Sequence, residues 1–315
     1  MDLMTTHEQQ DVAALARDFA RREIAPHVAD YDREERFPVE IVREAAELGL
    51  MGGVVPPEHG GAGLDHKTYA MVVEEISRVC HVVGVALTLP SGLVGNSILT
   101  FAHLGVDERS GRKRICAFIV DRDLPGVGVH PLANKFGFRP IKTGELVLDD
   151  VRVPADALVG EEGRGFAVAM NAVESGRLGV ATRAVGLGQA CVDSMVDYAR
   201  ERIVFGEPIA KLQMVQKMIA DSLTEVEAAR LLVLRLADLR DRGERARSAA
   251  SMAKMYASDA ALHAAINAFQ VHGAYAVSDE YPVGRYLRDA KIFQIVEGNN
   301  ELHRALIAEG AVGFR

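Results

Sequence analysis

In residues 292–304, "IFQIVEGNNELHR", the carboxylate Glu297 lies directly after an apolar run and directly before a glycine. The apolar residues of this run, which we expect to be buried, are Ile292, Phe293, Ile295 and Val296. A buried carboxylate costs free energy unless it is paired or used in a reaction. The stretch alone therefore has two interpretations. Glu297 is either a base with a pKa raised by its surroundings, or a carboxylate at the start of a helix near an asparagine cap.

A second pair of candidate groups, Glu174 and Arg177, lies in "NAVESGR". Three residues apart on a helix, the two side chains can form an ordinary surface ion pair. The three cysteines are far apart, and none has another cysteine or a histidine at zinc-ligand spacing. The ten histidines form no HExxH motif, so we expect no metal site.

The composition narrows the class of protein. The chain has 315 residues, 49% hydrophobic and 25% charged, which is typical of a globular protein with a sizeable core. The net charge of −8 argues against a nucleic-acid surface. No apolar run reaches the length of a membrane span, and the first residues do not resemble a secretory signal. Together with the unpaired cysteines Cys80, Cys116 and Cys191, this predicts a cytoplasmic location.

The elements that must position these groups change in kind along the chain. Residues 5–101 have helical periodicity, including a helix at about 91–103. Short β-branched stretches at 115–123, 126–137 and 144–154 predict strands, whereas 106–114 looks like a hairpin loop with no strand before it. From about Gly163 the pattern is helical again, and long helices without repeats suggest a bundle.

Six stretches carry a resemblance to a known family, and they occur in that family's order. They are "FPVEIVREAAELGLMGGVVPPEHGGAGLD", "KFGFRPIKTGELVLDDVRVP", "GEEGRGFAVAMNAVESGRLGVA", "YARERIVFGEPIAKLQMVQ", "AFQVHGAYAV" and "YPVGRYLRDAKIFQIVEGNNE". The chain resembles the FAD-dependent acyl-CoA dehydrogenases. The resemblance implies a mainly α fold with a small β domain: an N-terminal all-α domain (1–105), a remnant of the middle β domain (106–160) and a C-terminal four-helix bundle (161–315).

The resemblance also implies an activity. An acyl thioester, carried by coenzyme A or by a carrier protein, loses its α-proton to a base and its β-hydride to FAD, giving the trans-2-enoyl product of fatty acid metabolism. Electrons then pass to an acceptor like the electron-transfer flavoprotein. The protein would be a homo-oligomer, as a rule a tetramer, with each FAD shared between two chains. The alternative from another class is a noncatalytic, flavin-poor assembly protein that retains the fold.

Matching the motifs residue by residue gives each candidate a role. Glu297 matches the catalytic base, although Val296 and Asn299 replace the tyrosine and threonine of the family motif. Some members carry the base one residue before the matched arginine, where this chain has Gly176. The residues matched to substrate binding are Glu174, Arg177 and Gly298. Those matched to FAD binding are Arg202, Phe205, Gln213, Gln270, Gly273, Asn299 and Glu301.

The resemblance is incomplete in the middle domain. The family's "TEP…GSD" and "W-I-T-N"-like segments, which hold the flavin ring, do not occur in this sequence. Ala274 and Ala276 also replace two glycines of the family's QxxGGxG motif, which would shift the backbone beside the cofactor. The break in the resemblance falls between Gly105 and Val106. Because the remaining strands would expose unpaired edges, we expect these two residues not to be bonded to each other.

Overall fold

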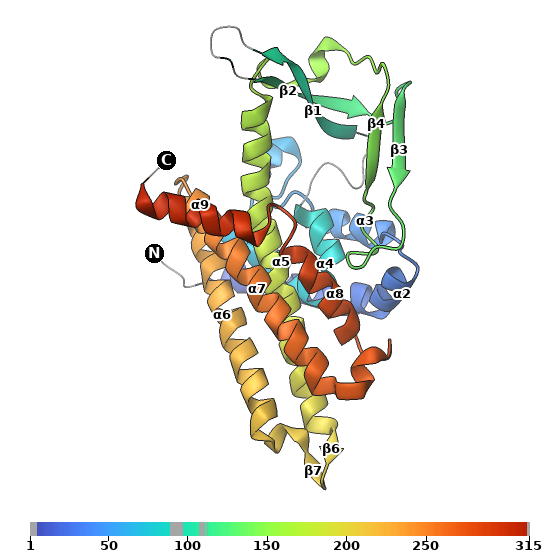
Figure 1. Cartoon of the computed structure of the whole chain (residues 1–315), viewed down its shortest axis with the longest axis vertical. Coiled ribbons are helices and arrows are strands. Elements are labelled where there is room, and N and C mark those ends of the chain that lie inside the picture. Colours follow the sequence, from blue (N-terminus) through green and yellow to red (C-terminus); the bar gives the residue numbers. More distant parts are fainter. Residues whose placement is uncertain (1–4, 89–96, 107–110, 112, 314–315) are drawn as a thin grey trace.

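The computed structural model describes residues 5–88, 97–106, 111 and 113–313. Helices come first, strands follow, and a second set of helices completes the chain (Figure 1). The helices are α1 (His7–Phe19), α2 (Val28–Arg33), α3 (Val39–Glu47), α4 (His66–Thr88), α5 (Gly165–Glu201), α6 (Gln213–Asp241), α7 (Arg247–His272), α8 (Val283–Phe293) and α9 (Asn300–Val312). The strands are β1 (Ser97–Val106), β2 (Lys113–Asp121), β3 (Val127–Pro131), β4 (Gly144–Leu148), β5 (Leu158–Val159), β6 (Ile203–Val204) and β7 (Glu207–Pro208).

Helices α1 to α4 lie within the N-terminal region for which the sequence predicts helices. Thr6 caps α1 by accepting a hydrogen bond from the backbone N–H of Gln9, whose side chain in turn accepts one from the N–H of Thr6. The helix then widens into a π turn, Ala20–Ile24, just before Pro26. Helix α4 is long and largely buried, and its backbone leaves helical geometry at Cys80 (φ −149°, ψ 101°).

The β region corrects two expectations from the sequence. Strand β1 occupies part of the expected helix at 91–103 and provides the strand that was thought to be missing before the loop at 106–114; residues 89–96 lie outside the described part. The order β1-β2-β5 is antiparallel, with a separate β3-β4 hairpin beside it. Pairing explains the difference, because β2 has an edge that only a neighbouring strand can satisfy.

The predicted break in the chain is also wrong. Gly105 and Val106 are consecutive residues of β1, and the register with β2 shifts between His103 and Val106. Gly105 has φ +108°, a conformation open to glycine, which accommodates this irregularity. Strand β1 is therefore continuous through the expected break and pairs with β2 on both sides of it.

Helix α5 connects the sheet to the bundle. It has 37 residues, about 55 Å at 1.5 Å per residue, and runs from the sheet to the β6-β7 hairpin (Figure 1). At its start Gly165 contacts the backbone of β2, since a Cβ there would lie 2.4 Å from the carbonyl carbon of Cys116. Helices α4, α6, α7 and α8 pack around α5. Much of the buried side of α7 is alanine, which allows close approach of the helix axes.

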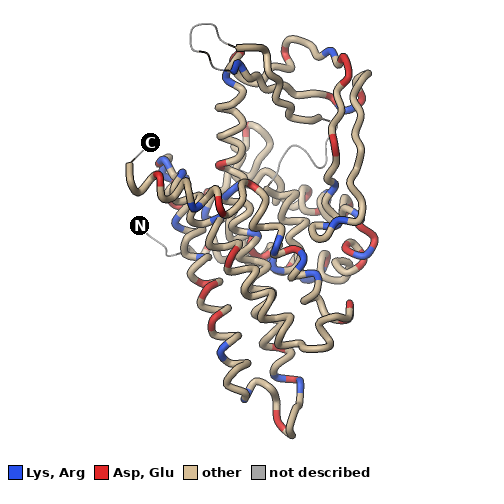
Figure 2. The backbone as a smooth tube through the Cα atoms, viewed as in Figure 1, with Lys and Arg blue, Asp and Glu red and all other residues tan. Residues whose placement is uncertain are grey.

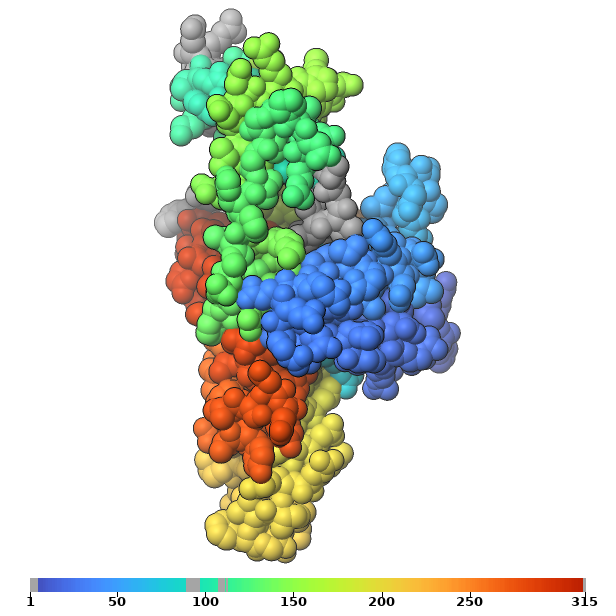
Figure 3. Space-filling model, turned by 90° about the vertical axis from the view of Figure 1, so that its right-hand side faces the viewer, coloured from blue at the N-terminus to red at the C-terminus, as the bar shows by residue number. Residues whose placement is uncertain are grey.

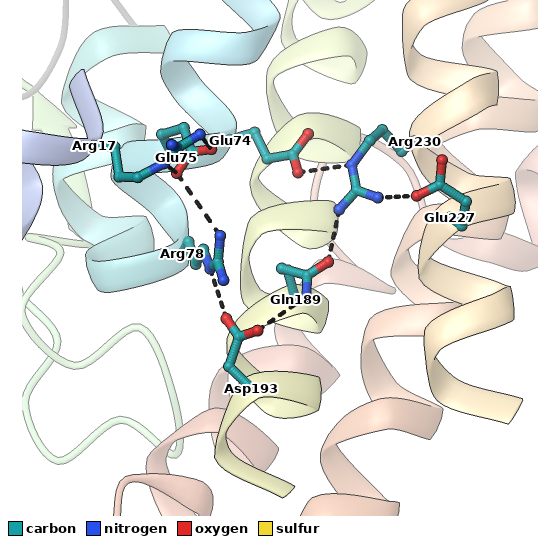
Figure 4. Close-up of polar contacts among 8 residues, drawn as sticks. All are labelled: Arg17, Glu74, Glu75, Arg78, Gln189, Asp193, Glu227 and Arg230. Carbon is teal, nitrogen blue, oxygen red and sulfur yellow. Dashed lines mark hydrogen bonds and ion pairs between the residues drawn. The ribbon is translucent and has the colours of Figure 1, made fainter. Parts of the chain in front are cut away.

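A chain of polar contacts joins the N-terminal helices to the bundle (Figure 4). Arg230 of α6 donates to Glu74 of α4 at 2.8 Å and to Gln189 of α5 at 2.8 Å. Gln189 continues to Asp193, which accepts from Arg78 of α4 at 2.6 Å. Burial raises the pKa of Glu74, and the charge of Arg230 opposes that rise. The contacts fix the position of α4 beside α5, which the site described below depends on.

The views from two sides show how these parts are arranged. The N-terminal helices lie against one side of the molecule, the strands form one end, and the β6-β7 hairpin with the start of α6 forms the other end (Figure 3). Charged residues are sparse along α7 (Figure 2). After its first residue, Arg247, the helix contains one lysine, Lys254, one acidic residue, Asp259, and no further arginine. None of the described helices is both long and apolar enough to cross a membrane.

Candidate functional site

Glu297 lies in the turn between α8 and α9. Its φ of +56° is in the left-handed region, which is unfavourable for a residue with a side chain, and Gly298 follows with φ +92°. Asn299 caps α9 by accepting a hydrogen bond from the N–H of Leu302 at 2.9 Å. The asparagine cap expected from the sequence therefore exists. Glu297 precedes it by two residues and is not itself a residue of the helix start.

The apolar run before Glu297 is only partly buried. Phe293 is completely buried and Ile292 and Val296 are partly buried, whereas the side chain of Ile295 is 55% exposed. The expectation that all four would be buried is wrong for Ile295. Helix α8 ends at Phe293, so the next residues no longer follow the helical face that points to the core.

The carboxylate of Glu297 lies directly over Gly176 of α5. A Cβ placed on Gly176 would come within 2.7 Å of Cδ of Glu297 and within 2.8 Å of both its oxygens. The resemblance matches Gly176 to the alternative position of the base, so a base side chain there and the Glu297 carboxylate would compete for one volume. The missing side chain at Gly176 is what allows Glu297 to occupy it.

Three positive charges surround this carboxylate, and none forms an ion pair with it within 4.0 Å among the described residues. Burial raises the pKa of Glu297, while Arg183, Arg177 and Lys254 oppose the rise. Arg177 is only 6% exposed, and its Nε has no hydrogen-bond partner in the described part of the chain. Arg183 is also buried, with Nε donating to the carbonyl of Gly179 and the guanidinium 5.7 Å from the ring of Phe293.

The simple ion pair that Glu174 and Arg177 could have formed is not present. Within the described ranges no contact of 4.0 Å or less joins the two charged groups, although Glu174 acts on Arg177 at longer range. Instead, the carbonyl of Glu174 accepts a hydrogen bond from Arg240 of α6. Burial lowers the pKa of Arg177. A buried, incompletely paired guanidinium is the arrangement expected where a ligand supplies the missing acceptor.

An apolar cavity of about 250 Å³ lies between α4 and α5, and its lining also includes Val54 and Val55 from the loop before α4 and Arg240 of α6. Its wall on α5 comprises Ser175, Leu178, Gly179 and Thr182, and its wall on α4 includes Tyr69, Val73, Leu87 and Thr88. The Tyr69 hydroxyl donates to the carbonyl of Leu87 at 2.5 Å. Gly53 allows the Tyr69 ring this position, because a Cβ on Gly53 would lie 2.3 Å from the ring. The cavity can hold a short apolar chain, and its wall includes Ser175, the residue directly before Gly176.

The residues matched to FAD binding fall into two groups. Asn299 and Glu301 are exposed at the start of α9, close to Glu297. The other five, all exposed, lie at the far end of α5: Arg202, Phe205, Gln213, Gln270 and Gly273. The Arg202 guanidinium is 5.4 Å from the ring of Tyr275, and Phe205 is 94% exposed with φ +53°. From Gly176 to Arg202 the helix spans about 40 Å, so one chain does not bring the two groups together.

Three residues at the site were missed by the reasoning from sequence: Arg183, Lys254 and His303. Lys254 is completely buried in α7, where its surroundings in sequence, "SAASMAKMYASDAA", consist mainly of small residues. A lone lysine at an apolar position of such a helix was a usable signal. Arg183 and His303 offered none, because isolated charged residues in a helix are usually solvated.

Comparison with known proteins is consistent along the whole chain. Residues 6–109 match the acyl-CoA dehydrogenase N-terminal domain, and residues 163–312 match the acyl-CoA dehydrogenase C-terminal domain. An acyl-CoA dehydrogenase of Bacillus subtilis is 36% identical over an alignment that covers 98% of this chain and 99% of the relative. That alignment extends over 374 residues, more than the 315 of this chain, so the relative has segments with no counterpart here. The mitochondrial short-chain specific acyl-CoA dehydrogenase of Bos taurus is 33% identical, covering 98% of this chain and 90% of the relative.

Solved structures give the same result for the fold. The butyryl-CoA dehydrogenase of Megasphaera elsdenii superposes with a TM-score of 0.90 at 30% identity, covering 99% of this chain and all of the other. A glutaryl-coenzyme A dehydrogenase in complex with glutaryl-CoA superposes with a TM-score of 0.93 at 30% identity, covering 100% and 98%. In sequence and in fold, the chain belongs to the acyl-CoA dehydrogenase family and is an oxidoreductase of that type.

Proposed function

We propose that this protein converts an acyl thioester to its trans-2-enoyl thioester, with Glu297 as the base that removes the α-proton. The observation that carries the proposal is the position of the Glu297 carboxylate, which lies over Gly176, the residue after Ser175 in the cavity wall. Burial raises its pKa, and no ion pair within 4.0 Å uses its charge in the described part of the chain. A carboxylate of raised pKa is a stronger base for a carbon acid than an exposed one.

The binding roles follow from the same geometry. We assign the acyl chain to the cavity between α4 and α5. Ser175 lies in the wall of this cavity, directly before Gly176, so the thioester end of the substrate would have to extend past Ser175 to reach Glu297. Arg177, a buried cation with an unpartnered Nε, is available to the thioester carbonyl as negative charge develops there. Gly298, at φ +92°, leaves the backbone free to approach the thioester, and Glu174 is assigned to the substrate by its match to the family motif.

FAD, when bound, would supply the acceptor for the hydride that leaves the β-carbon. Asn299 and Glu301 would hold it near Glu297, whereas Arg202 and its neighbours are too far along α5 to reach the same molecule. We therefore assign Arg202, Phe205, Gln213, Gln270 and Gly273 to the FAD of a second copy of the chain. The exposed Arg202 suits a pyrophosphate because its planar fork can bond two oxygens. Nothing lies within 4 Å of a Cβ at Gly273, so the backbone there is open to a ligand. This arrangement requires a homo-oligomer, a tetramer by analogy with the family.

The acyl carrier and the electron acceptor complete the proposal. Coenzyme A is the carrier named for the relatives, and an acyl carrier protein is the alternative to be assayed beside it. One structural relative, with a TM-score of 0.93 at 30% identity, is described with the electron transferring flavoprotein of Acidaminococcus fermentans. We propose an acceptor of that kind here. If the purified protein contains no flavin and does not bind it, the noncatalytic alternative replaces this proposal.

The test compares Glu297→Gln with wild type. Glutamine keeps the shape of the side chain and removes its basicity, so kcat should fall by about 10³-fold or more while FAD content is unchanged. Glu47→Gln, at an exposed position at the end of α3, is the matched control and should behave as wild type. Near-normal turnover of Glu297→Gln would refute the assignment and make Glu174 the next candidate base.

A further inference from the structure

The turn that carries Glu297 is held from two helices through its backbone carbonyls. Nζ of Lys254, on α7, donates to the carbonyl of Gly298 at 2.7 Å. Nε2 of His303, on α9, lies 3.2 Å from the carbonyl of Glu297, at hydrogen-bond distance. Both side chains are completely buried. Because Glu297 has a positive φ, the turn is strained, and these two contacts oppose its relaxation.

Lys254 also belongs to a buried polar network behind the turn. Its Nζ donates to Oδ1 of Asn300 at 2.8 Å. The amide of Asn300 donates to Oγ of Ser258 at 2.9 Å and to Oδ1 of Asp259 at 2.7 Å. Asp259 further accepts from Arg304. The network therefore fixes where the ammonium group of Lys254 lies, and the ammonium group fixes the turn.

The charge of Lys254 has no ion-pair partner within 4.0 Å in the part of the chain that the structure describes. Burial lowers the pKa of Lys254 to about 8, so the group remains mainly protonated at neutral pH. The charged or titratable groups that act on it or lie beside it on the packed helices are Asp259 of α7, Arg177 of α5, Glu297 in the turn, and Glu301 and His303 of α9. Its positive charge in turn acts on the Glu297 carboxylate.

We propose that Lys254 is a positioning residue for proton abstraction: its ammonium group clamps the strained Glu297–Gly298 turn and supplies positive charge that keeps the carboxylate ionised. This inference rests on the proposed function, in which Glu297 is the base. The clamp places the carboxylate over Gly176, and the charge offsets part of the cost of burying it. A lysine that only filled space in α7 would have no effect on the ionisation of Glu297.

The test uses Lys254→Met, which keeps the length of the side chain and removes both the hydrogen bonds and the charge. The ionisation of Glu297 is followed in the protein without turnover, by NMR of ¹³C-labelled glutamate carboxyls, with Glu297→Gln assigning the signal. We expect the pKa of Glu297 to rise by about one unit and the acid limb of the kcat/KM profile to move by the same amount. With the carboxylate displaced, kcat should fall about 10- to 100-fold and KM should change little. Lys217→Met replaces an exposed lysine of α6 and is the control. It should leave the pKa of Glu297, the acid limb of the kcat/KM profile, kcat and KM unchanged.

The outcomes separate the inference from the function it rests on. An unchanged Glu297 pKa and acid limb in Lys254→Met, with activity still lost in Glu297→Gln, would overturn the role of Lys254 alone. Full activity of Glu297→Gln would overturn the proposed function, whatever the NMR titration gives. If Lys254→Met does not fold, the wild-type titration decides. The Glu297 signal should show a second inflection near pH 8, where Lys254 loses its proton. Absence of that inflection overturns the inference.

Discussion

Substitution of Gly176 by alanine would place a methyl group in the volume that the Glu297 carboxylate occupies. The new carbon would lie 2.7–2.8 Å from the carboxyl atoms, whereas ordinary contacts of this kind are about 3.5 Å, so the carboxylate must move by about 0.7 Å. A misplacement of about 1 Å at a reacting group can lower the rate about 10²-fold. We therefore expect kcat for dehydrogenation to fall by between 10- and 100-fold.

The free energy of unfolding of Gly176→Ala should rise slightly or stay nearly unchanged, although kcat falls. Replacing a glycine inside a helix by alanine stabilises it by about 0.5–1 kcal/mol. Displacing the Glu297 carboxylate costs free energy that offsets part of this stabilisation, because Glu297 belongs to a turn that is already strained. The free energy of unfolding from urea titration should therefore lie within about 1 kcal/mol of wild type, while the initial rate with a short acyl-CoA falls.

Gly310→Ala provides the matched control for this experiment. Gly310 lies in α9, and the nearest atom to its added Cβ is Oγ of Ser248 at 4.0 Å, so only the helix propensity changes. It should be as stable as wild type or slightly more so, with unchanged kcat. If Gly176→Ala kept wild-type kcat, the position of the carboxylate over α5 would not matter for the reaction, and the geometric argument for Glu297 would fail.

Three further changes test other parts of the structure. Arg230→Met leaves the partly buried Glu74 without its main partner and should lower the free energy of unfolding by about 2 kcal/mol. The double variant Arg230→Met/Glu74→Gln should recover much of this loss, and an equal loss in the single and double variants would contradict the argument. Burial lowers the pKa of His303 to about 4, so between about pH 6.5 and 4 the unfolded chain binds a proton that the folded chain does not, and stability falls as the pH falls. His303→Gln should therefore flatten the acid side of the stability profile by up to about 3 kcal/mol, and an unchanged slope in urea titrations would argue against a neutral buried imidazole. Arg202→Ala should weaken FAD binding at least tenfold with little change in melting temperature, and a monomeric protein with full flavin content would refute sharing between chains.

The helices could be predicted from the sequence because their apolar residues recur with the period of the buried stripe. Strand β1 could not, since residues 97–106 adopt a strand only when β2 presents an edge to pair with. The sequence does predict that Glu297 follows an apolar run with buried residues, and Phe293 is buried. The position of Glu297 over Gly176 depends on how two distant helices meet, which no local pattern contains.

The charged residues around Glu297 also could not be predicted as a group from the sequence. The small residues around Lys254 indicate that it is buried, but neither its helix nor that of Arg183 indicates in sequence that the charged group faces the carboxylate. Their influence on Glu297 arises from packing α5 and α7 against the turn, and burial strengthens it because the surroundings are poorly polarisable. The family resemblance provided the identity of the candidate base, but not the set of cations that modulate it.

The uninterrupted length of α5 restricts how this protein can change. Gly176 lies in α5 and Arg202 directly follows its last residue, Glu201, so the rotation and the distance between the two are set by the number of residues in between. Deleting or inserting one residue there would turn the distal half by about 100° and slide it by about 1.5 Å, carrying Arg202 and the β6-β7 hairpin to a different side of the bundle. Loops such as the one between α6 and α7 can gain or lose residues without this effect. Between these two positions, change is therefore confined to substitutions, and a length variant of α5 would have to be compensated by another in the same helix.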